Sequence, residues 1–244
     1  MTDTEKQELV PIALDAMGGD FAPGETVAGA VQAATGGGVA IALVGDPPAL
    51  ERELAGHDTA GLPIRVVPSN GVVEEGEAPA RAFRSKPEAS IFVASQLVKM
   101  GKAKAVVSMG SSGATIAAAT VLFGTFDGID RGALGGPVNG LSPNTTVIDV
   151  GTSVDCKPQQ LADFAALGSV MSRVVFGVEN PRVALLSVGA EDGKGNALVR
   201  EATVLLEASG LNFIGNVEAY DIPFGRADVI ACDGFVGNVV MKLT

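Results

Sequence analysis

The 244-residue chain has a formal net charge of −11; hydrophobic residues make up 47% of it and charged residues 18%. This acidic balance disfavours non-specific binding to nucleic acid, because the phosphate backbone repels negative charge. No apolar run reaches the ~18 residues of a membrane span, so we expect a soluble globular protein. The start, MTDTEKQELV, lacks the features of a signal peptide and predicts a cytoplasmic protein with a disordered tail over residues 1–9.

Short apolar runs alternate with helical patterns along the chain, which is typical of βα units around a mostly parallel sheet with helices on both faces. Beginning in PIALDAMGGD, the predicted strands lie near residues 11–15, 39–46, 64–69, 105–114, 145–153, 183–189 and 227–234. The predicted helices cover residues 25–35, 48–55, 88–100, 113–123, 158–176, 195–209 and 235–243. We therefore predict an α/β fold, with residues 10–244 as a single domain and LGGPVNGLSPN at 134–144 as a long loop or internal seam.

The stretch SVGAEDGKGN at residues 187–196 leaves an apolar strand and enters a helix. Its glycines allow a tight turn, the amides that open the next helix suit an anion, and Lys194 adds a positive charge beside Gly195. Asn196 occupies a helix-cap position, where its amide serves the helix, a ligand or both. An ordinary capped turn and an anion site both fit this loop.

Three further strand exits carry glycines and polar side chains. LDAMGGDFAPGETV places Asp15 at a strand end, where a carboxylate fixes the loop, positions a polar substrate or accepts a proton. Because ligands bind at the carboxyl ends of parallel strands, we expect all four loops to share one edge of a sheet. The other residues of interest are Gly18, Gly19, Ser111, Ser112, Gly113, Asp233, Gly237 and Asn238.

A protein nucleophile has no evident base. The single histidine, His57, lies in the polar segment ELAGHDTAG and is best interpreted as a surface residue. Cys156 and Cys232 form neither a disulfide framework nor, with one histidine, a zinc site, so we predict buried thiols and no metal or cofactor. If an acyl group is transferred here, the nucleophile is a bound substrate held by amides and cations.

Taken in order, the loops resemble those of phosphate acyltransferases of the PlsX type. The likeness runs from about residue 10 to residue 244 through DAMGGDFAPGETV, SMGSSGA, GTSVDCKP, SVGAEDGKGN, NFIGNVEA and ADVIACDGFVGNVVMK. Each motif is short, but the ordered set is specific. Members of that family continue for several tens of residues beyond the equivalent of Thr244, into a region that the resemblance links to a lipid-facing tip and a dimer surface.

The resemblance implies a function. Such enzymes transfer a long-chain acyl group from acyl carrier protein to inorganic phosphate and make acyl phosphate for phospholipid synthesis. It also implies a homodimeric cytoplasmic enzyme, peripherally associated with the membrane, with an α/β/α sandwich related to phosphotransacetylases and isocitrate dehydrogenases. Carried onto this chain, it adds Asp155 to the binding residues. It makes Lys194 a clamp for phosphate and oxyanion, Asn196 and Asn238 amide donors, and Asp15 and Asp233 orienting carboxylates.

The chain departs from the family's usual pattern in three of these loops. Ser111 and Ser112 replace an Asn-Thr pair, and Thr152 and Ser153 replace an Ala-Asn pair. Because hydroxyl groups still form hydrogen bonds, we expect altered affinity rather than a different reaction. Glu191 and its neighbours also stand where the family commonly has a run of glutamates.

Two alternatives remain open from the sequence. The first alternative is a phosphate acetyl- or butyryltransferase that uses coenzyme A. The second is a non-catalytic phosphate-binding fragment. Acyl carrier protein needs a basic docking patch, and residues 81–104 supply one unless they are only a solvated helix face. The basic residues are Arg81, Arg84, Lys86, Lys99, Lys102 and Lys104.

Overall fold

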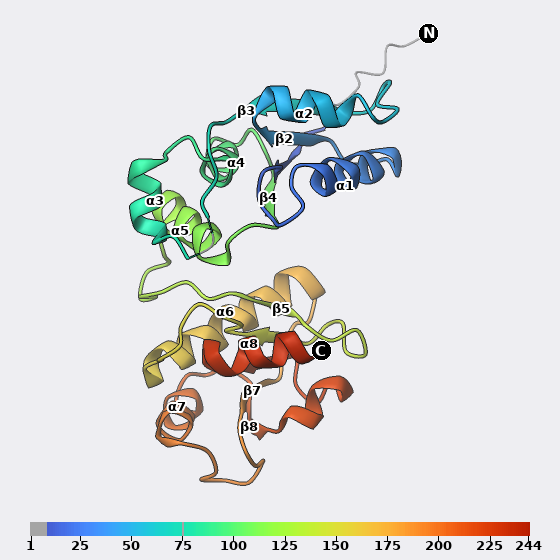
Figure 1. The fold of residues 1–244 in the computed structure, drawn as a ribbon. Helices are drawn as coiled ribbons and strands as arrows, with labels where there is room; N and C mark the ends of the chain where they lie inside the picture. The colour runs from blue at the N-terminus through green and yellow to red at the C-terminus, as the bar shows by residue number, and fades with distance from the viewer. Residues whose placement is uncertain (1–8, 75) are drawn as a thin grey trace. The chain divides into compact units, whose positions relative to one another are not determined.

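The computed structural model describes residues 9–74 and 76–244, and the chain divides into two compact units. Unit 1 ends at Gly124 and unit 2 begins at Thr125, and each contains its own sheet (Figure 1). The α/β class with mostly parallel strands is confirmed. The expectations of one sheet, and of four loops along one edge of it, are wrong, because the strands between residues 12 and 108 and those between residues 135 and 231 pair only within their own units among the described residues.

Unit 1 is built on a four-stranded parallel sheet in the order β3-β2-β1-β4. The central strand β2 is buried along its whole length, which explains its unbroken apolar sequence IALVG. Asp15 and Ser108 end neighbouring strands and lie opposite each other in the register. The strands are β1 Ile12–Asp15, β2 Ile41–Gly45, β3 Ile64–Pro68 and β4 Ala105–Ser108.

Helices cover both faces of the unit 1 sheet. On one face, α1 and α2 bury Val27, Leu43 and Leu50; on the other, α4 packs on Ala13 and Val44. Because adjacent strand residues point to opposite faces, β1 and β2 contribute to both clusters. The helices are α1 Gly24–Thr35, α2 Pro47–Leu54, α3 Pro79–Ser85, α4 Ser90–Lys99 and α5 Ser112–Phe123.

Unit 2 has a five-stranded sheet in the order β5-β6-β9-β7-β8, parallel except for the antiparallel edge strand β5. Strands β6 and β9 have three residues each and β7 has four, and all three strands are almost fully buried. Their carboxyl ends lead to the predicted loops at Thr152, Lys194 and Asp233. The strands are β5 Gly135–Pro137, β6 Thr146–Ile148, β7 Val183–Leu186, β8 Phe213–Val217 and β9 Val229–Ala231.

The helices of unit 2 also form two layers. Phe164 of α6 and Leu206 of α7 lie in the core on one face, whereas Ile222 of the 3-10 helix and Val240 of α8 pack on the other. The sequence accounts for the ends of α6, because Pro158 occupies its first position and Gly177 ends it in a left-handed conformation. The helices are α6 Pro158–Phe176, α7 Ala197–Glu207, the 3-10 helix η1 Ala219–Phe224 and α8 Gly234–Leu243.

Predicted and observed elements differ in a few places. The seven predicted helices occur with bounds shifted by at most two residues. The sequence did not predict α3, β5, β8 or η1, which are short or lack a clear period. Of the two interpretations of residues 134–144, the internal seam is wrong, because the units meet in the chain at Gly124/Thr125. After the short strand of residues 135–137, residues 138–145 do form a loop. Residues 1–8 of the predicted tail lie outside the described residues.

Candidate functional site

The predicted residues of unit 1 gather where β1 and β4 end. Asp15 is 2% exposed, and its Oδ2 accepts a hydrogen bond of 2.7 Å from the hydroxyl of Ser108. The Ser108 hydroxyl in turn accepts one from the Gly110 amide at 3.1 Å. A Cβ on Gly18 would lie 2.6 Å from Asp15 Oδ2 and 2.9 Å from Gly110 N, so only glycine fits there. The two strand exits are therefore packed directly against each other.

The serine loop of unit 1 serves a helix first. Ser111 is the N-cap of α5, and its hydroxyl accepts a hydrogen bond of 3.4 Å from the Ala114 amide. Ser112 and Gly113 are exposed in the first turn of the same helix. Ser111 therefore serves α5 as its cap, and a phosphate contact for Ser111, Ser112 or Gly113 stays a prediction. Sequence reasoning missed Ser108, although a serine at a strand end opposite Asp15 was the available signal.

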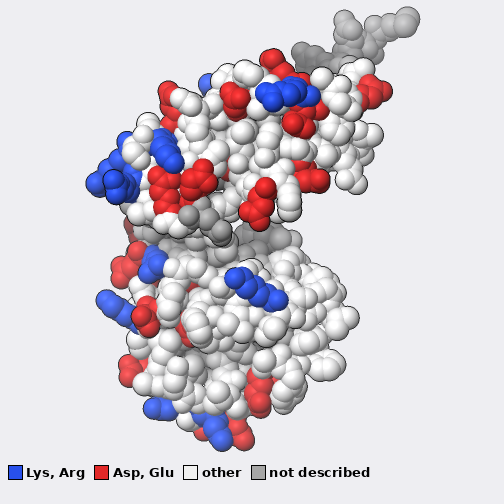
Figure 2. Space-filling model, viewed as in Figure 1, with Lys and Arg blue, Asp and Glu red and all other residues white. Residues whose placement is uncertain are grey.

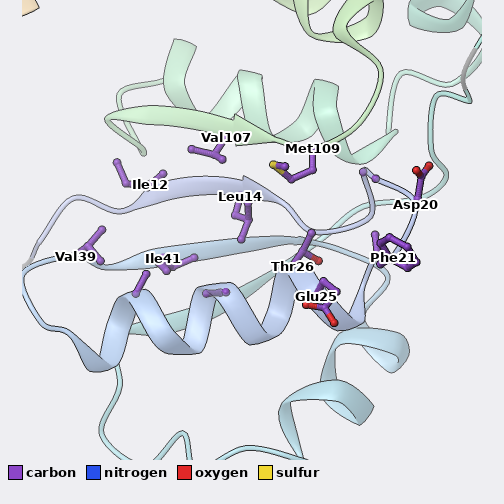
Figure 3. Close-up of a pocket in the computed structure, with 16 residues that line it drawn as sticks. Ile12, Leu14, Asp20, Phe21, Glu25, Thr26, Val39, Ile41, Val107 and Met109 are labelled. Atoms are coloured by element: carbon purple, nitrogen blue, oxygen red, sulfur yellow. The ribbon is translucent and has the colours of Figure 1, made fainter. Parts of the chain in front are cut away.

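An apolar cavity of about 610 Å³, here called the α1 cavity, lies beside the Gly18–Gly19 loop. Figure 3 shows Ile12, Leu14 and Ile41 along one side of it and α1 along another. The polar side chains of Asp20 and Glu25 lie at the end nearest the strand exits (Figure 3). Its volume falls within the range of about 300–1,000 Å³ that is usual for small-molecule sites. The sequence did not predict this cavity, since its lining comes from four separate elements.

In unit 2 the predicted residues lie along two different cavities. Asn196, Gly195 and Asp233 line a cavity of about 260 Å³ that also has several apolar side chains, here called the Asn196 cavity. Lys194 instead lines a more polar cavity of about 360 Å³ together with Arg200, here called the Lys194 cavity. The 187–196 loop therefore directs Lys194 and Asn196 to two different cavities.

Two polar side chains of the Asn196 cavity, those of Asn196 and Asp233, cap helices. Asn196 Oδ1 accepts a hydrogen bond of 2.9 Å from Val199 N at the start of α7. Asp233 Oδ1 accepts one of 2.9 Å from Val236 N at the start of α8. Capping uses one oxygen of each side chain, so the Asn196 amide nitrogen and the second Asp233 oxygen stay available to a ligand. Two roles therefore remain open for Asn196 and Asp233: each caps its helix alone, or each caps its helix and also contacts a ligand.

Two of the three remaining predicted residues of unit 2, Gly237 and Asn238, lie in the first turns of α8. A Cβ on Gly237 would lie 1.8 Å from the carbonyl oxygen of Asp149, so α8 depends on glycine to approach the end of β6. A Cβ on Gly151 would lie 3.9 Å from the Asn238 side chain, which places Asn238 beside the 150–153 loop. Asp155 is exposed at the end of that loop. Gly237 and Asn238 thus share one region, and Asp155 is near it in sequence.

Sequence reasoning missed the residue at the centre of this region, Asp149. It follows β6 directly, is 0% exposed, and accepts hydrogen bonds from both Thr152 and Ser153. The motif GTSVDC directed attention to the exposed Asp155 instead. The available signal was a lone acid at the end of an apolar strand in TTVIDVG, the same pattern that identified Asp15.

The two cysteines are poor nucleophiles in this fold. Burial, with the negative charges of Asp233 and Asp149, raises the pKa of the Cys156 thiol, and the same causes raise that of Cys232 further. Cys232 is 3% exposed, as predicted, whereas Cys156 is half-buried beside the Ser153 hydroxyl at 3.2 Å. Thiols with a raised pKa stay protonated near neutral pH, which disfavours an acyl-cysteine intermediate. His57 is exposed, as expected of a surface residue.

The predicted basic segment is only partly available for docking. Lys86 pairs with Glu77 at 2.8 Å and donates to the Val72 carbonyl, whereas Arg81 and Arg84 are exposed on α3. Lys and Arg side chains gather beside α3 in Figure 2, with acidic side chains next to them. In residues 9–74 and 76–244, no helix is long and apolar enough to cross a membrane. No cluster of three metal-ligating side chains occurs in those residues either.

A family profile described as "Fatty acid synthesis protein" matches residues 10–244. The chain belongs to this family. Within the fatty acid synthesis protein family, it is 50% identical over 233 residues to a phosphate acyltransferase from Heliobacterium modesticaldum, covering 95% of this chain and 69% of that protein. It is 49% identical over 234 residues to the phosphate acyltransferase of Thermosynechococcus vestitus, covering 95% and 68%. The resemblance to phosphate acyltransferases is thereby confirmed.

Solved structures similar to this family member support the fold. A phosphotransacetylase from Streptococcus pyogenes superposes with a TM-score of 0.65 at 19% identity, covering 97% of this chain and 81% of that one. The EutD phosphotransacetylase from Staphylococcus aureus gives 0.61 at 20% identity with the same coverage. At this identity the similarity shows a shared fold, as the sequence resemblance predicted.

Proposed function

We propose that this chain is an acyltransferase that moves a long-chain fatty acyl group from acyl carrier protein to inorganic phosphate, forming acyl phosphate for phospholipid synthesis. The observation that carries the proposal is 50% identity, over 95% of the chain, to a phosphate acyltransferase. The raised pKa of both cysteine thiols and the exposed position of His57 fit a reaction without a covalent enzyme intermediate.

In the proposed reaction, an oxygen of bound hydrogen phosphate attacks the thioester carbon. The thioester oxygen becomes an oxyanion, the carbon–sulfur bond breaks, and the phosphate proton goes to the leaving thiolate. The protein accelerates this step by placing phosphate against the thioester and by stabilising the oxyanion. Hydrogen-bond donors and one cation meet these needs without a protein nucleophile.

The proposed roles follow from this reaction. Lys194 clamps phosphate and oxyanion; its side chain is exposed and makes no ion pair among residues 9–74 and 76–244. Asn196 and Asn238 donate amide hydrogen bonds, and Asp15 and Asp233 orient the substrates. Because Lys194 and Asn196 line different cavities, the proposal requires the flexible lysine side chain to turn toward the substrate. The proposed binding residues are Gly18, Gly19, Ser111, Ser112, Gly113, Asp155, Gly195 and Gly237.

The α1 cavity supports a long acyl chain as the transferred group. Its lining is mostly apolar, and it begins at the Gly18–Gly19 loop that carries proposed substrate contacts. Each methylene group that an acyl chain buries in such a cavity stabilises its binding by about 0.8 kcal/mol. A short acetyl group would leave most of this cavity empty.

We further propose a homodimer in the cytoplasm that associates peripherally with the inner face of the membrane. The exposed Arg81 and Arg84 on α3 are the proposed contacts for acidic acyl carrier protein. Analytical ultracentrifugation and co-sedimentation with anionic vesicles test the dimer and the membrane association. A monomer that stays in the supernatant would remove both proposals.

The test of the reaction is phosphate-dependent release of free thiol from palmitoyl-acyl carrier protein, with acetyl-coenzyme A as the competing donor. We expect release from the carrier protein only, and only in the presence of phosphate. Release from acetyl-coenzyme A alone would identify a phosphate acetyltransferase. Phosphate binding without release from either donor would identify a non-catalytic phosphate-binding protein.

A further inference from the structure

Asp149 holds a fully buried carboxylate at the point where β6 ends. Its Oδ1 accepts hydrogen bonds from the backbone amides of Leu134 at 3.3 Å, Gly151 at 3.1 Å and Thr152 at 3.0 Å. Its Oδ2 accepts from the amide and hydroxyl of Ser153, both at 2.8 Å, and from the Thr152 amide and hydroxyl at 3.1 and 2.6 Å. The 150–153 loop is thus wrapped around one side chain.

This arrangement replaces a counter-ion with hydrogen bonds. No Lys or Arg pairs with Asp149 in the described part of the chain. A buried carboxylate is stable without a cation only when donors satisfy its oxygens. Because a carboxylate offers about four acceptor positions and six donor groups already occupy them, Asp149 has none left for a substrate. It acts through the loop that it holds.

The same residue sets the position of α8. The Gly234 amide donates to the Ser153 carbonyl at 2.7 Å, and a Cβ on Gly234 would lie 2.7 Å from Asp149 Oδ2. One turn later, α8 approaches the Asp149 carbonyl so closely that only Gly237 fits. The first two turns of α8 therefore lie directly on Asp149 and on the loop around it.

The first turns of α8 also carry two side chains with proposed roles, Asp233 at the N-cap and Asn238 one turn later. We propose that Asp149 is a positioning residue for acyl transfer: by saturating its carboxylate with the 150–153 loop, it holds that loop and the start of α8 in one arrangement. This inference rests on the proposed function, because it concerns the geometry of the same site. Loss of that arrangement moves Asp233 and Asn238 without removing either of them.

The deciding experiment compares Asp149→Asn with Asp221→Asn in the full chain. Asp221 is the matched control, because it is 3% exposed, lies in unit 2, and accepts the Glu218 amide at the start of η1. An asparagine at 149 turns an NH₂ group toward donors that need an acceptor. Since a misplacement of about 1 Å can cost on the order of 100-fold in rate, we expect kcat per folded molecule to fall at least tenfold.

We expect Asp221→Asn to lower the melting temperature but to leave kcat per folded molecule within about twofold, since it lies outside the site. Equal kcat values for Asp149→Asn and wild type, or equal losses in both variants, would overturn the inference. If Asp149→Asn does not fold, Thr152→Val provides the second test, because it removes one hydroxyl donor and keeps the carboxylate. A several-fold fall in kcat is then expected, and an unchanged kcat contradicts the proposal.

A readout independent of turnover separates this inference from the proposed function. Amide hydrogen exchange at Gly151, Thr152 and Ser153 is expected to be slow in wild type and in Asp221→Asn but fast in Asp149→Asn. If wild type releases no thiol, the proposed function fails, and the exchange data alone then decide whether Asp149 holds the loop. Unchanged protection of those three amides in Asp149→Asn would remove the inference even in an active enzyme.

Discussion

Both units carry a buried acid where an interior strand ends, but the two carboxylates are held differently. Asp15 in unit 1 is 2% exposed and accepts hydrogen bonds from the Ser108 hydroxyl and the Met17 amide. Asp149 in unit 2 is 0% exposed and is surrounded by six donor groups. Each lies against a glycine whose Cβ would approach within 2.6 or 2.7 Å. The same local design therefore leaves one carboxylate with acceptor capacity and saturates the other.

This difference separates two tasks. An acid with spare acceptor positions is able to orient a substrate, which is the role proposed for Asp15. A saturated acid fixes backbone, which is the role inferred for Asp149. Unit 1 also holds the apolar α1 cavity, whereas unit 2 holds the exposed Lys194. The comparison predicts that acyl-chain selection depends on unit 1 and that charge stabilisation depends on unit 2.

The largest expected effect is on charge stabilisation in unit 2. Lys194→Ala is expected to lower kcat by about 10²–10³-fold, the usual loss when an oxyanion contact is removed, while the melting temperature stays unchanged. Lys242→Ala, another exposed lysine of unit 2, is the control and is expected to leave thiol release unaffected. Full activity in Lys194→Ala would show that another residue supplies the positive charge of the site.

A second prediction concerns the close approach of α8 to Asp149. Gly237→Ala places a methyl group 1.8 Å from a backbone oxygen, so α8 must shift, and we expect a loss of about 3 kcal/mol in the free energy of unfolding. Gly29→Ala in α1 is the control, because no atom lies within 4 Å of its added Cβ. That substitution is expected to stabilise the protein by up to about 1 kcal/mol. Urea unfolding of both variants measures the difference.

The α1 cavity yields a smaller effect on substrate choice. Ala33→Phe adds a large side chain to its lining and is expected to shift kcat/KM about tenfold from palmitoyl- toward octanoyl-carrier protein, because bulk in an apolar pocket discriminates by ~1–3 kcal/mol. Gln32→Phe is the matched control, since Gln32 is exposed on the same helix but does not line the cavity. An unchanged chain-length preference in Ala33→Phe would place the acyl chain elsewhere.

The smallest effect tests an acid of unit 2 that does have a cation. Burial acts to raise the pKa of Asp228, but hydrogen bonds from Arg182 outweigh it and lower the pKa. Asp228 therefore stabilises the fold above the ordinary carboxyl pKa of about 3.9, and this contribution is lost as the pH falls through the lowered folded value. Because Arg182 is nearly half exposed, we expect Asp228→Asn to cost only about 1 kcal/mol at pH 7.

Thermal unfolding of wild type and Asp228→Asn between pH 7 and pH 2 checks the sign. The difference in melting temperature is expected to shrink as the pH falls below about 4, because Asp228 takes up a proton first in the unfolded state and only at lower pH in the folded state. A difference that stays constant to pH 2 would show that the asparagine acts through packing rather than through lost charge.

The local structure around many candidate site residues was predictable because its signals are local. Asp15, Asn196 and Asp233 each follow an apolar strand or open a helix, and a few neighbouring residues are enough to show that pattern. Asp149 has the same local pattern, but its importance lies in donors from residues 134 and 151–153 and in the approach of α8. Those contacts have no sequence period, so a reading of neighbouring residues does not show them.

The sequence by itself determined the α/β class, the bounds of the long helices and the family, because helical periodicity, strand exits and ordered motifs are local properties of the chain. Only the tertiary structure decided that the strands form two sheets and that Lys194 and Asn196 line separate cavities. Strand pairing depends on hydrogen bonds between distant segments, and the direction of a loop side chain depends on packing. Neither property is encoded in the spacing of neighbouring residues.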